Sequence, residues 1–311
     1  MNAAAQPFVM PRSRFRVLVE DYAELTKARV TSLVVMTAWC GYYFGAQASG
    51  FSSWAWGLFH ALVGIGAVSA GTAALNEVME HQIDAHMRRT AHRPLPAGRM
   101  SRMHGALVGF FLTVGGALYL GLACNPLTGW LSLLTAFVYL AAYTPLKRVH
   151  PICTFVGAFP GAMPGLLGWT AVRGRLEWGA IVMFAIVFFW QFPHFFSIAW
   201  LYREDYERGG IRMLPVVRPD GRSTSLRIML YSVVLIPVTL APTILGMSGR
   251  IYFVGAIIMG VALCYFGGRL ATLGLPLNAP RSKQRARQLL QATVIYLPLL
   301  FALMMLNTLS S

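Results

Sequence analysis

The chain has 311 residues, of which 56% are hydrophobic and only 12% are charged, and its mean hydropathy is +0.57. These values exclude an ordinary soluble enzyme and a disordered chain, since soluble domains run near 45–50% apolar and about 25% charged. The net charge of +15 comes from short basic clusters between apolar runs, which favours membrane topology, anionic lipid or an anionic substrate over nucleic acid.

Nine apolar runs follow one another, each close to the roughly 20 residues that a transmembrane helix needs. They are Val30–Gln47, Trp54–Leu75, His104–Ala123, Leu127–Tyr143, Ile152–Ala171, Trp178–Trp200, Leu226–Leu245, Ile251–Leu273 and Leu289–Leu306. We therefore expect an all-α polytopic membrane protein with nine transmembrane helices. Residues 1–29 are expected to form a cytoplasmic N-terminal segment, and residues 30–311 one transmembrane domain with long cytoplasmic loops at 76–103 and 201–225.

The basic residues are distributed unevenly between the two sides of such a bundle. With the N-terminus in the cytoplasm, 23 of the 26 Lys and Arg residues lie on the cytoplasmic side, and only Arg173, Arg175 and Arg250 lie on the other. Cytoplasmic loops of membrane proteins carry this excess of Lys and Arg. The sequence therefore predicts a multi-pass protein of the bacterial inner membrane, with a cytoplasmic N-terminus and an external C-terminus.

The segment that closes the second apolar run carries oxygen-bearing side chains at a regular spacing. Asn76, Glu80 and Asp84 stand at i, i+4 and i+8. Because four residues turn a helix by about 400°, each step drifts by only about 40° and rises by about 6 Å. The three side chains therefore share one helical stripe. Such hard oxygen ligands suit Mg²⁺, which usually takes one or two carboxylates together with substrate phosphates and water.

The charge changes sign directly after this stripe. The run from Arg88 to Arg93 offers guanidinium groups that can bind phosphate oxygens in a forked geometry. Acids for a metal followed by arginines for phosphate indicate a diphosphate ligand. The alternative is a solvated helix end in which Glu80 or Asp84 pairs with Arg88. Carboxylates at a membrane edge are costly to bury unless a cation compensates them, which favours the functional interpretation.

Several longer motifs follow in a fixed order. They are Arg88–Leu95 (RRTAHRPL), Tyr143–Arg148 (YTPLKR), Trp190–Phe195 (WQFPHF), Asp205–Tyr206 and Gly210–Pro215 (GIRMLP). Together with the stripe, they make the chain resemble the UbiA superfamily of intramembrane prenyltransferases over nearly its whole length from about Lys27 onward. Within that superfamily the chain is most similar to the branch that farnesylates heme, which also has Glu at the position of Glu80.

This resemblance implies a reaction, a cofactor, partners and site residues. The reaction is transfer of a farnesyl group from farnesyl diphosphate to a vinyl group of protoheme IX (heme B), with addition of water to give heme O and diphosphate. Mg²⁺ is the implied cofactor. Membrane lipid is an expected partner, as are heme A synthase or oxidase assembly factors. The implied catalytic and metal-binding residues are Asn76, Glu80, Asp84 and Asp205, and the implied diphosphate-binding residues are Arg89, Arg93, Lys147 and Arg148.

The chain departs from the family pattern in its second acidic motif. The branch usually has Lys-Asp-Asp-Tyr, whereas this chain has the run Arg203–Tyr206 (REDY). Further aspartates of that motif elsewhere in the superfamily are replaced here by Arg208 and Arg212. These replacements weaken the case for a second metal ion held by several aspartates.

Two features of the later spans bear on the acceptor. His194 lies inside an apolar run, where an ionisable residue is a functional candidate, and an imidazole can ligate heme iron. The alternative is a hydrogen bond of His194 within a helix kinked by Pro193. Four glycines predict either close helix packing or room for a flat substrate. They are Gly157, Gly161, Gly165 and Gly168.

Two other functions remain open at this point. One is prenylation of an aromatic quinone precursor, which would use the same donor chemistry. The other is transport of an anionic solute, with the basic loops as a docking field. Transporters usually place their ionisable groups near the membrane midplane, whereas here they gather at one edge, so the sequence favours the enzyme.

Overall fold

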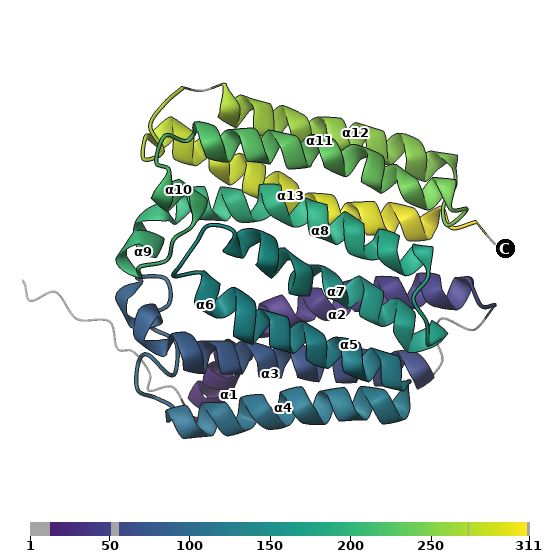
Figure 1. Cartoon of the computed structure of the whole chain (residues 1–311), viewed down its shortest axis with the longest axis horizontal. Coiled ribbons are helices and arrows are strands. Elements are labelled where there is room, and N and C mark those ends of the chain that lie inside the picture. The colour runs from purple at the N-terminus through teal and green to yellow at the C-terminus, as the bar shows by residue number, and fades with distance from the viewer. Residues whose placement is uncertain (1–12, 51–55, 273, 310–311) are drawn as a thin grey trace, which may run out of the picture.

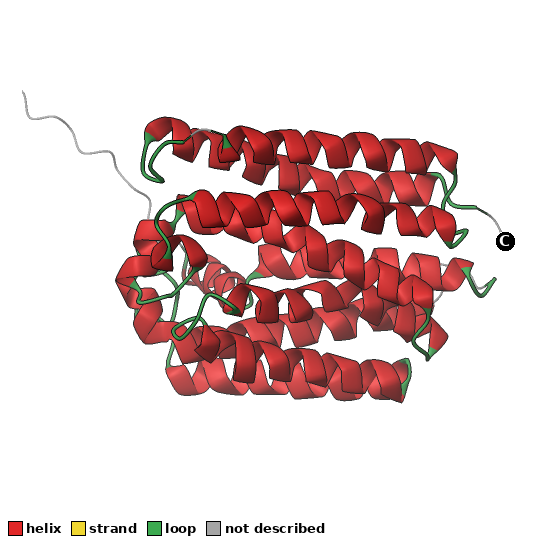
Figure 2. Ribbon diagram, turned by 45° about the horizontal axis from the view of Figure 1, so that its top comes forward, coloured by secondary structure: helices red, strands yellow, loops and turns green. Residues whose placement is uncertain are grey.

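A computed structural model describes residues 13–50, 56–272 and 274–309. Residues 1–12 of the predicted N-terminal segment, and the predicted run ends at Trp54 and Leu273, lie outside these residues. The described residues form helices without a named strand, as expected for an all-α membrane protein (Figures 1 and 2). The helices are α1 (Arg14–Leu25), α2 (Ala28–Gln47), α3 (Trp56–His86), α4 (Arg102–Ala123), α5 (Pro126–Phe137), the π-helix η1 (Val138–Tyr143), α6 (Thr144–Leu146), α7 (Cys153–Arg173), α8 (Trp178–Leu201), α9 (Arg203–Arg208), α10 (Leu214–Val217), α11 (Arg222–Ile244), α12 (Arg250–Ala271) and α13 (Pro280–Leu306).

The chain is a multi-pass membrane protein. In the part that the structure describes, eight helical segments are long and apolar enough to cross a membrane, so the predicted count of nine is one too high by this measure. The predicted span outside this set is α2. It is 20 residues long, but polar residues such as Arg29, Thr31 and Gln47 lower its mean hydropathy. It still runs along the bundle beside α7 (Figure 1).

The long helices form two units of the same design. In the first unit α3 packs on α4, α4 on α5 and α5 on α7, and α3 also contacts α7. In the second unit α8, α11, α12 and α13 contact one another in the same cyclic order. The units meet where α7 packs on α8. The two long connections, after α3 and after α8, therefore lie at one end of the bundle, on the left of Figure 1, which we call the motif end.

Glycine allows α2 to lie directly against α7. A Cβ atom on Gly41 would overlap the carbonyl of Gly165, and one on Gly168 would overlap the carbonyl of Ala38. A Cβ atom on Gly157 would likewise overlap the ring of Tyr143. The structure thus decides between the two interpretations of the glycines, in favour of close packing between helices.

The length of α3 places the acidic stripe at the membrane edge. Its 31 residues span about 46 Å at 1.5 Å per residue, whereas the hydrocarbon core of a bilayer is about 30 Å thick. The excess of about 16 Å matches the last eleven residues, which begin at Asn76. The stripe therefore starts where the apolar part of α3 ends.

Candidate functional site

The predicted stripe on α3 exists and is buried. Asn76 is 0% exposed, Glu80 7% and Asp84 1%. Side chains of these types are seldom buried without a partner. The structure supplies a cationic partner to each of the three.

The first contact joins α3 to the junction between α1 and α2. The Lys27 ammonium donates to Oδ1 of Asn76 at 2.6 Å, and Nδ2 of Asn76 donates to Oγ1 of Thr144 at 3.1 Å. Burial lowers the pKa of Lys27, because the charged form loses its water. Asn76 is therefore held from both sides, and its carbonyl oxygen already accepts from a cation.

The two carboxylates of the stripe form ion pairs with more distant residues. Nζ of Lys147 donates to both oxygens of Glu80, at 2.9 and 3.0 Å. Nη1 of Arg93 donates to Oδ2 of Asp84 at 2.6 Å. Hydrogen bonds between charged groups at these distances are among the stronger ones in proteins. The predicted alternative, a pair between either acid and Arg88, is not formed.

The π-helix η1 brings Thr144 and Lys147 to the stripe. A π-bulge interrupts the regular hydrogen bonding of a helix and is frequent at functional sites. Here Oγ1 of Thr144 donates to the carbonyl of Tyr139 at 2.9 Å. The Lys147 ammonium then lies 4.5 Å from the centre of the Tyr143 ring, a geometry that favours a cation.

The loop after α3 is fastened to the helix that carries the stripe. Oγ1 of Thr90 donates to the carbonyl of Asp84 at 3.0 Å, and the Leu95 amide donates to Oε1 of Glu77 at 3.2 Å. Glu77 is fully buried, and its second oxygen has no partner among the described residues. These contacts fold the arginine run back over the stripe, so that Arg93 reaches Asp84.

Two residues near the stripe were not predicted from the sequence. Glu77 stands one residue after Asn76 at the end of an apolar run, so its charge was the signal that could have found it. Lys27 is the only non-glycine residue with a positive φ (47°) among the described residues. Strained backbone of this kind gathers at functional sites, but its presence cannot be deduced from the sequence.

The structure does not gather all the predicted residues around one point. Asp205 is buried in α9 and pairs with Arg208, while the Arg89 guanidinium lies over the rings of Tyr202 and Tyr206, 5.7 and 6.0 Å from their centres. Arg148 is exposed, and no contact of its side chain with the stripe is present. Within the described residues, no three His, Cys, Asp or Glu side chains form a metal-binding group.

The residues on the stripe nevertheless fit a magnesium ion that completes its coordination from a substrate. Mg²⁺ binds to proteins through one or two carboxylates and takes substrate phosphates and water as its other ligands. Glu80 and Asp84 supply two carboxylates and Asn76 supplies an amide oxygen, all on one face of α3. The surrounding lysines and arginines suit the phosphates themselves.

His194 lies between α8 and α13, away from the stripe. Its Nδ1 is 2.9 Å from Oγ1 of Thr293, and its ring stacks on that of Trp190 at 4.9 Å between centres. Since the Thr293 hydroxyl donates to the carbonyl of Leu290 at 2.6 Å, it accepts from Nδ1–H of His194. This tautomer leaves Nε2 with a lone pair, as in histidines that ligate metals. The partner of His194 is therefore on another helix, not within its own kinked helix.

A helical bundle with a buried acidic stripe and a basic loop at one membrane edge defines the chain as an intramembrane prenyltransferase. The chain belongs to the UbiA prenyltransferase family, which matches residues 33–283. It is 59% identical over 307 residues to the protoheme IX farnesyltransferase of Koribacter versatilis, covering 99% of each chain. It is 46% identical to the protein of that name from Solibacter usitatus, covering 93% of this chain and 99% of the other.

Solved structures support the fold. A structure of digeranylgeranylglyceryl phosphate synthase has a TM-score of 0.74 at 16% identity, with coverage of 93% of this chain and 98% of the other. A UbiA homologue from Archaeoglobus fulgidus bound to GPP and Mg²⁺ has a TM-score of 0.59 at 17% identity, with coverage of 91% and 99%.

Proposed function

We propose that this chain transfers the farnesyl group of farnesyl diphosphate to a vinyl group of protoheme IX and adds water, giving heme O and diphosphate. The observation that carries the proposal is the buried stripe in which Asn76, Glu80 and Asp84 each contact a cation. The sequence similarity over nearly the whole chain to proteins named protoheme IX farnesyltransferase supports this choice of substrates.

The ion pairs of the stripe suggest how a diphosphate is bound. Lys147 and Arg93 form ion pairs with Glu80 and Asp84. When Mg²⁺ is present with the donor, it would supply positive charge to the leaving diphosphate. Glu80 and Asp84 would hold the metal, and Lys147 and Arg93 would bind phosphate oxygens. Each buried charge would then have a partner of opposite sign.

The chemistry follows from charge stabilisation at this edge. The C1–O bond of the farnesyl group breaks, and its electron pair leaves on the diphosphate, which the cations around the stripe stabilise. The vinyl π bond attacks C1, and water adds to the resulting cation and loses a proton. Arg89 and Arg148 are proposed as further diphosphate ligands, and Asp205 as a fourth member of the metal and catalytic set.

His194 is proposed as an axial ligand of the heme iron. Its Nδ1–H is engaged by Thr293, so Nε2 is the nitrogen available to iron. We expect His194→Ala to change the Soret band on heme titration while the affinity for farnesyl diphosphate is kept. An unchanged spectrum and affinity for heme would refute this role. Thr293→Val is the matched variant, because it removes the hydrogen bond and keeps the imidazole.

The proposed location is the bacterial inner membrane, with the motif end and the N-terminus in the cytoplasm and the C-terminus outside. Residues 1–29 would then be cytoplasmic, and residues 30–311 would form the membrane domain with its cytoplasmic loops at 76–103 and 201–225. Reporter fusions after Gly98 and Gly246 should report opposite sides, and a reporter at the N-terminus should report the side of Gly98. The N-terminal reporter also tests whether α2 crosses the membrane, because it would report the side opposite Gly98 if α2 did not cross.

Mass analysis tests the reaction itself. The chain is expressed in a membrane that lacks heme O, and the pigments are extracted. A farnesylated heme that appears with the chain and disappears with Asp84→Asn supports the proposal. Release of pyrophosphate in detergent with a quinone precursor but not with heme would instead support the aromatic prenyltransferase. Heme A synthase and oxidase assembly factors remain proposed partners.

A further inference from the structure

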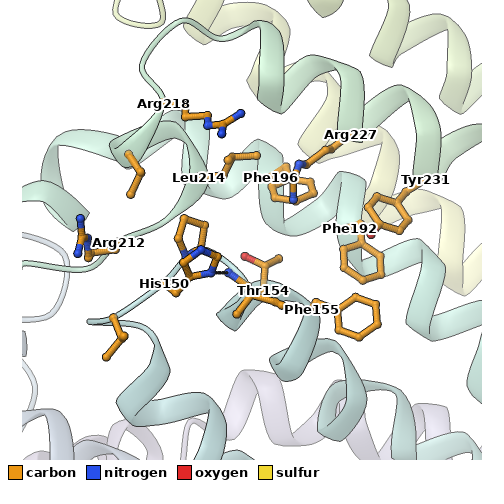
Figure 3. Close-up of a pocket in the computed structure, with 14 residues that line it drawn as sticks. His150, Thr154, Phe155, Phe192, Phe196, Arg212, Leu214, Arg218, Arg227 and Tyr231 are labelled. Carbon is orange, nitrogen blue, oxygen red and sulfur yellow. Dashed lines mark hydrogen bonds between the residues drawn. The ribbon is translucent and has the colours of Figure 1, made fainter.

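A cavity of about 480 Å³ opens at the motif end, on the side of α8 that faces α7 and α11 (Figure 3). Its walls come from the segment 149–152 with the first residues of α7, from the second half of α8, from the segment 212–218 that contains α10, and from the first half of α11. The volume falls within the ~300–1,000 Å³ of small-molecule sites. None of the residues that we assign to the acidic stripe lines it.

The polar side of the cavity is basic. Arg212, Arg218, Arg227 and His150 line it, and no Asp or Glu does. Among the described residues, no carboxylate lies within ion-pair distance of the three guanidinium groups. Lys147 and Arg93, by contrast, are each paired with an acid of the stripe. The cavity therefore presents uncompensated positive charge, which favours an anionic ligand.

Aromatic residues also line the cavity, and Arg227 lies beside them (Figure 3). Phe155 is half exposed and Tyr231 half-buried, whereas Phe192 and Phe196 are buried. The rings of Phe192 and Tyr231 are stacked 3.8 Å apart with 13° between their planes. Phe188, outside the cavity, packs edge-to-face on Phe192 at 5.3 Å between ring centres. The accessible rings of Phe155 and Tyr231 favour a flat aromatic ligand over flexible acyl chains.

His150 contributes a donor and not an iron ligand. Its Nδ1 accepts from the Ile152 amide at 3.1 Å, so the proton of the neutral ring is on Nε2. That tautomer has no free lone pair for a metal. With the three arginines, His150 offers hydrogen bonds to carboxylates.

The cavity shares a segment with the stripe. The Arg212 amide donates to the Lys147 carbonyl at 2.8 Å, and Nζ of the same Lys147 contacts Glu80. The Thr154 hydroxyl contacts the sulfur of Met213 at 3.8 Å. A ligand held by Arg212 therefore lies next to the segment that carries a proposed diphosphate ligand.

We propose that this cavity is a docking site for the acceptor. It binds a flat tetrapyrrole by its two carboxylates, with the ring against Phe155 and Tyr231. The inference rests on the proposed function for the identity of the acceptor. This site is separate from the one that His194 would provide, because Phe192 and His194 point about 200° apart around α8. A tetrapyrrole docked here is therefore not ligated by His194. The docking site recognises carboxylates, so it does not require iron.

The test uses the full chain in phosphatidylcholine nanodiscs and iron-free protoporphyrin IX as the probe. Arg218→Gln with Arg227→Gln removes two charges from the cavity. Arg222→Gln with Arg281→Gln removes two charges from exposed positions at the same end that do not line it. We expect porphyrin affinity to fall about 10-fold or more in the first variant, since charged hydrogen bonds to carboxylates are lost, and to stay unchanged in the second.

Protoporphyrin dimethyl ester provides the second measurement. It lacks the carboxylate charges, so we expect it to bind the wild type and the cavity variant equally. The proposal is overturned if the cavity variant binds protoporphyrin as tightly as the wild type does, or if the control variant loses as much affinity as the cavity variant. It is also overturned if the ester binds the cavity variant more weakly than the wild type by the same factor as the free acid. Loss of a retained anionic phospholipid from the cavity variant, with porphyrin affinity unchanged, would assign the cavity to lipid.

Failure of the docking site and failure of the proposed function give different results. If the wild type makes farnesylated heme and the cavity variant still binds porphyrin normally, the docking site is wrong and the function stands. If the wild type binds porphyrin through these arginines but makes no farnesylated heme, the proposed function fails.

Discussion

Acidic and basic side chains are paired differently at the two ends of the bundle. At the end opposite the motifs, Glu177 accepts hydrogen bonds from Arg173, Arg175 and Trp169 at 2.7 to 2.9 Å, and Arg173 also donates to Ser49 at 2.6 Å. One acid thus accepts from three side chains near the α7–α8 connection, and Arg173 links it to Ser49 after α2. At the motif end, acids and cations are paired across long loops, and further arginines are left without an acid.

This difference contrasts a structural network with the site that we propose for the substrate. In the Glu177 network both carboxylate oxygens accept hydrogen bonds from Arg173, and Arg175 and Trp169 donate to the same carboxylate. The motif end has buried carboxylates paired with lysine and arginine side chains, and further arginines without an acid among the described residues. We propose that a metal and a diphosphate replace these pairs when the donor binds.

The largest effect is expected at the acidic stripe. Asp84→Asn or Glu80→Gln keeps the volume of the side chain and removes a charge from the proposed metal site. Activity should fall on the order of 10²-fold or more, the scale seen when a transition-state stabiliser is lost. Initial rates measure the loss of activity, and the yield of folded protein in detergent shows whether folding is preserved. Glu207→Gln, an exposed acid at the same end, is the control. Normal rates at limiting Mg²⁺ in both stripe variants would refute the site.

A smaller loss is expected at Lys27. Lys27→Met removes the ammonium that contacts Asn76, so farnesyl diphosphate should bind about 10-fold more weakly if the ammonium supplies one charged hydrogen bond to the donor. The apparent KM for the donor is the measurement. Arg29→Met removes an exposed charge two residues away and should leave KM unchanged. An equal change in both variants would mean that only the net charge of this end matters.

The opposite end should affect stability and not the reaction. Glu177→Gln breaks the ion pair with Arg173 and should cost about 1–3 kcal/mol of stability, seen as a lower Tm in detergent. KM for the donor should not change. A clear loss of activity at unchanged stability would show that the two ends are not independent.

The pH dependence of stability gives the finest test of this network. Hydrogen bonds from Arg173 lower the pKa of Glu177 from 4.5 to about 2. Because the folded pKa lies below the unfolded one, the contribution of Glu177 to stability is complete above pH 4.5 and is lost as pH falls toward about 2. The Tm of the wild type should therefore fall more steeply over this window than that of Glu177→Gln. Parallel curves would contradict the assignment.

Much of the fold was predictable because it depends on local patterns. Apolar runs of about 20 residues predict membrane helices, and eight of the nine predicted runs are confirmed as helices apolar enough to cross. The exception, α2, shows the limit of hydropathy. Its polar residues lower the average, while its glycines let it pack against α7. That packing depends on a partner far away in the sequence.

The acidic stripe was also predictable, but its partners were not. Asn76, Glu80 and Asp84 share a face through helix periodicity alone. Which cation meets which oxygen depends on contacts that span 49 residues for Lys27 and 67 for Lys147. The large cavity at Phe192 and Tyr231 shows the same limit, since its walls come from four separate elements.

The sequence by itself therefore determined the class of protein, the number of membrane-spanning helices among the described residues to within one, and the face of α3 on which Asn76, Glu80 and Asp84 lie. Periodicity and hydropathy suffice for this because they act within a single helix. Only the tertiary structure decided that Lys147 and Arg93 hold the two carboxylates, that His194 turns its Nδ1 to Thr293, and that three unpaired arginines converge on an aromatic cavity. Those arrangements depend on how helices distant in the chain pack together, and on the cost of leaving a buried charge without a partner.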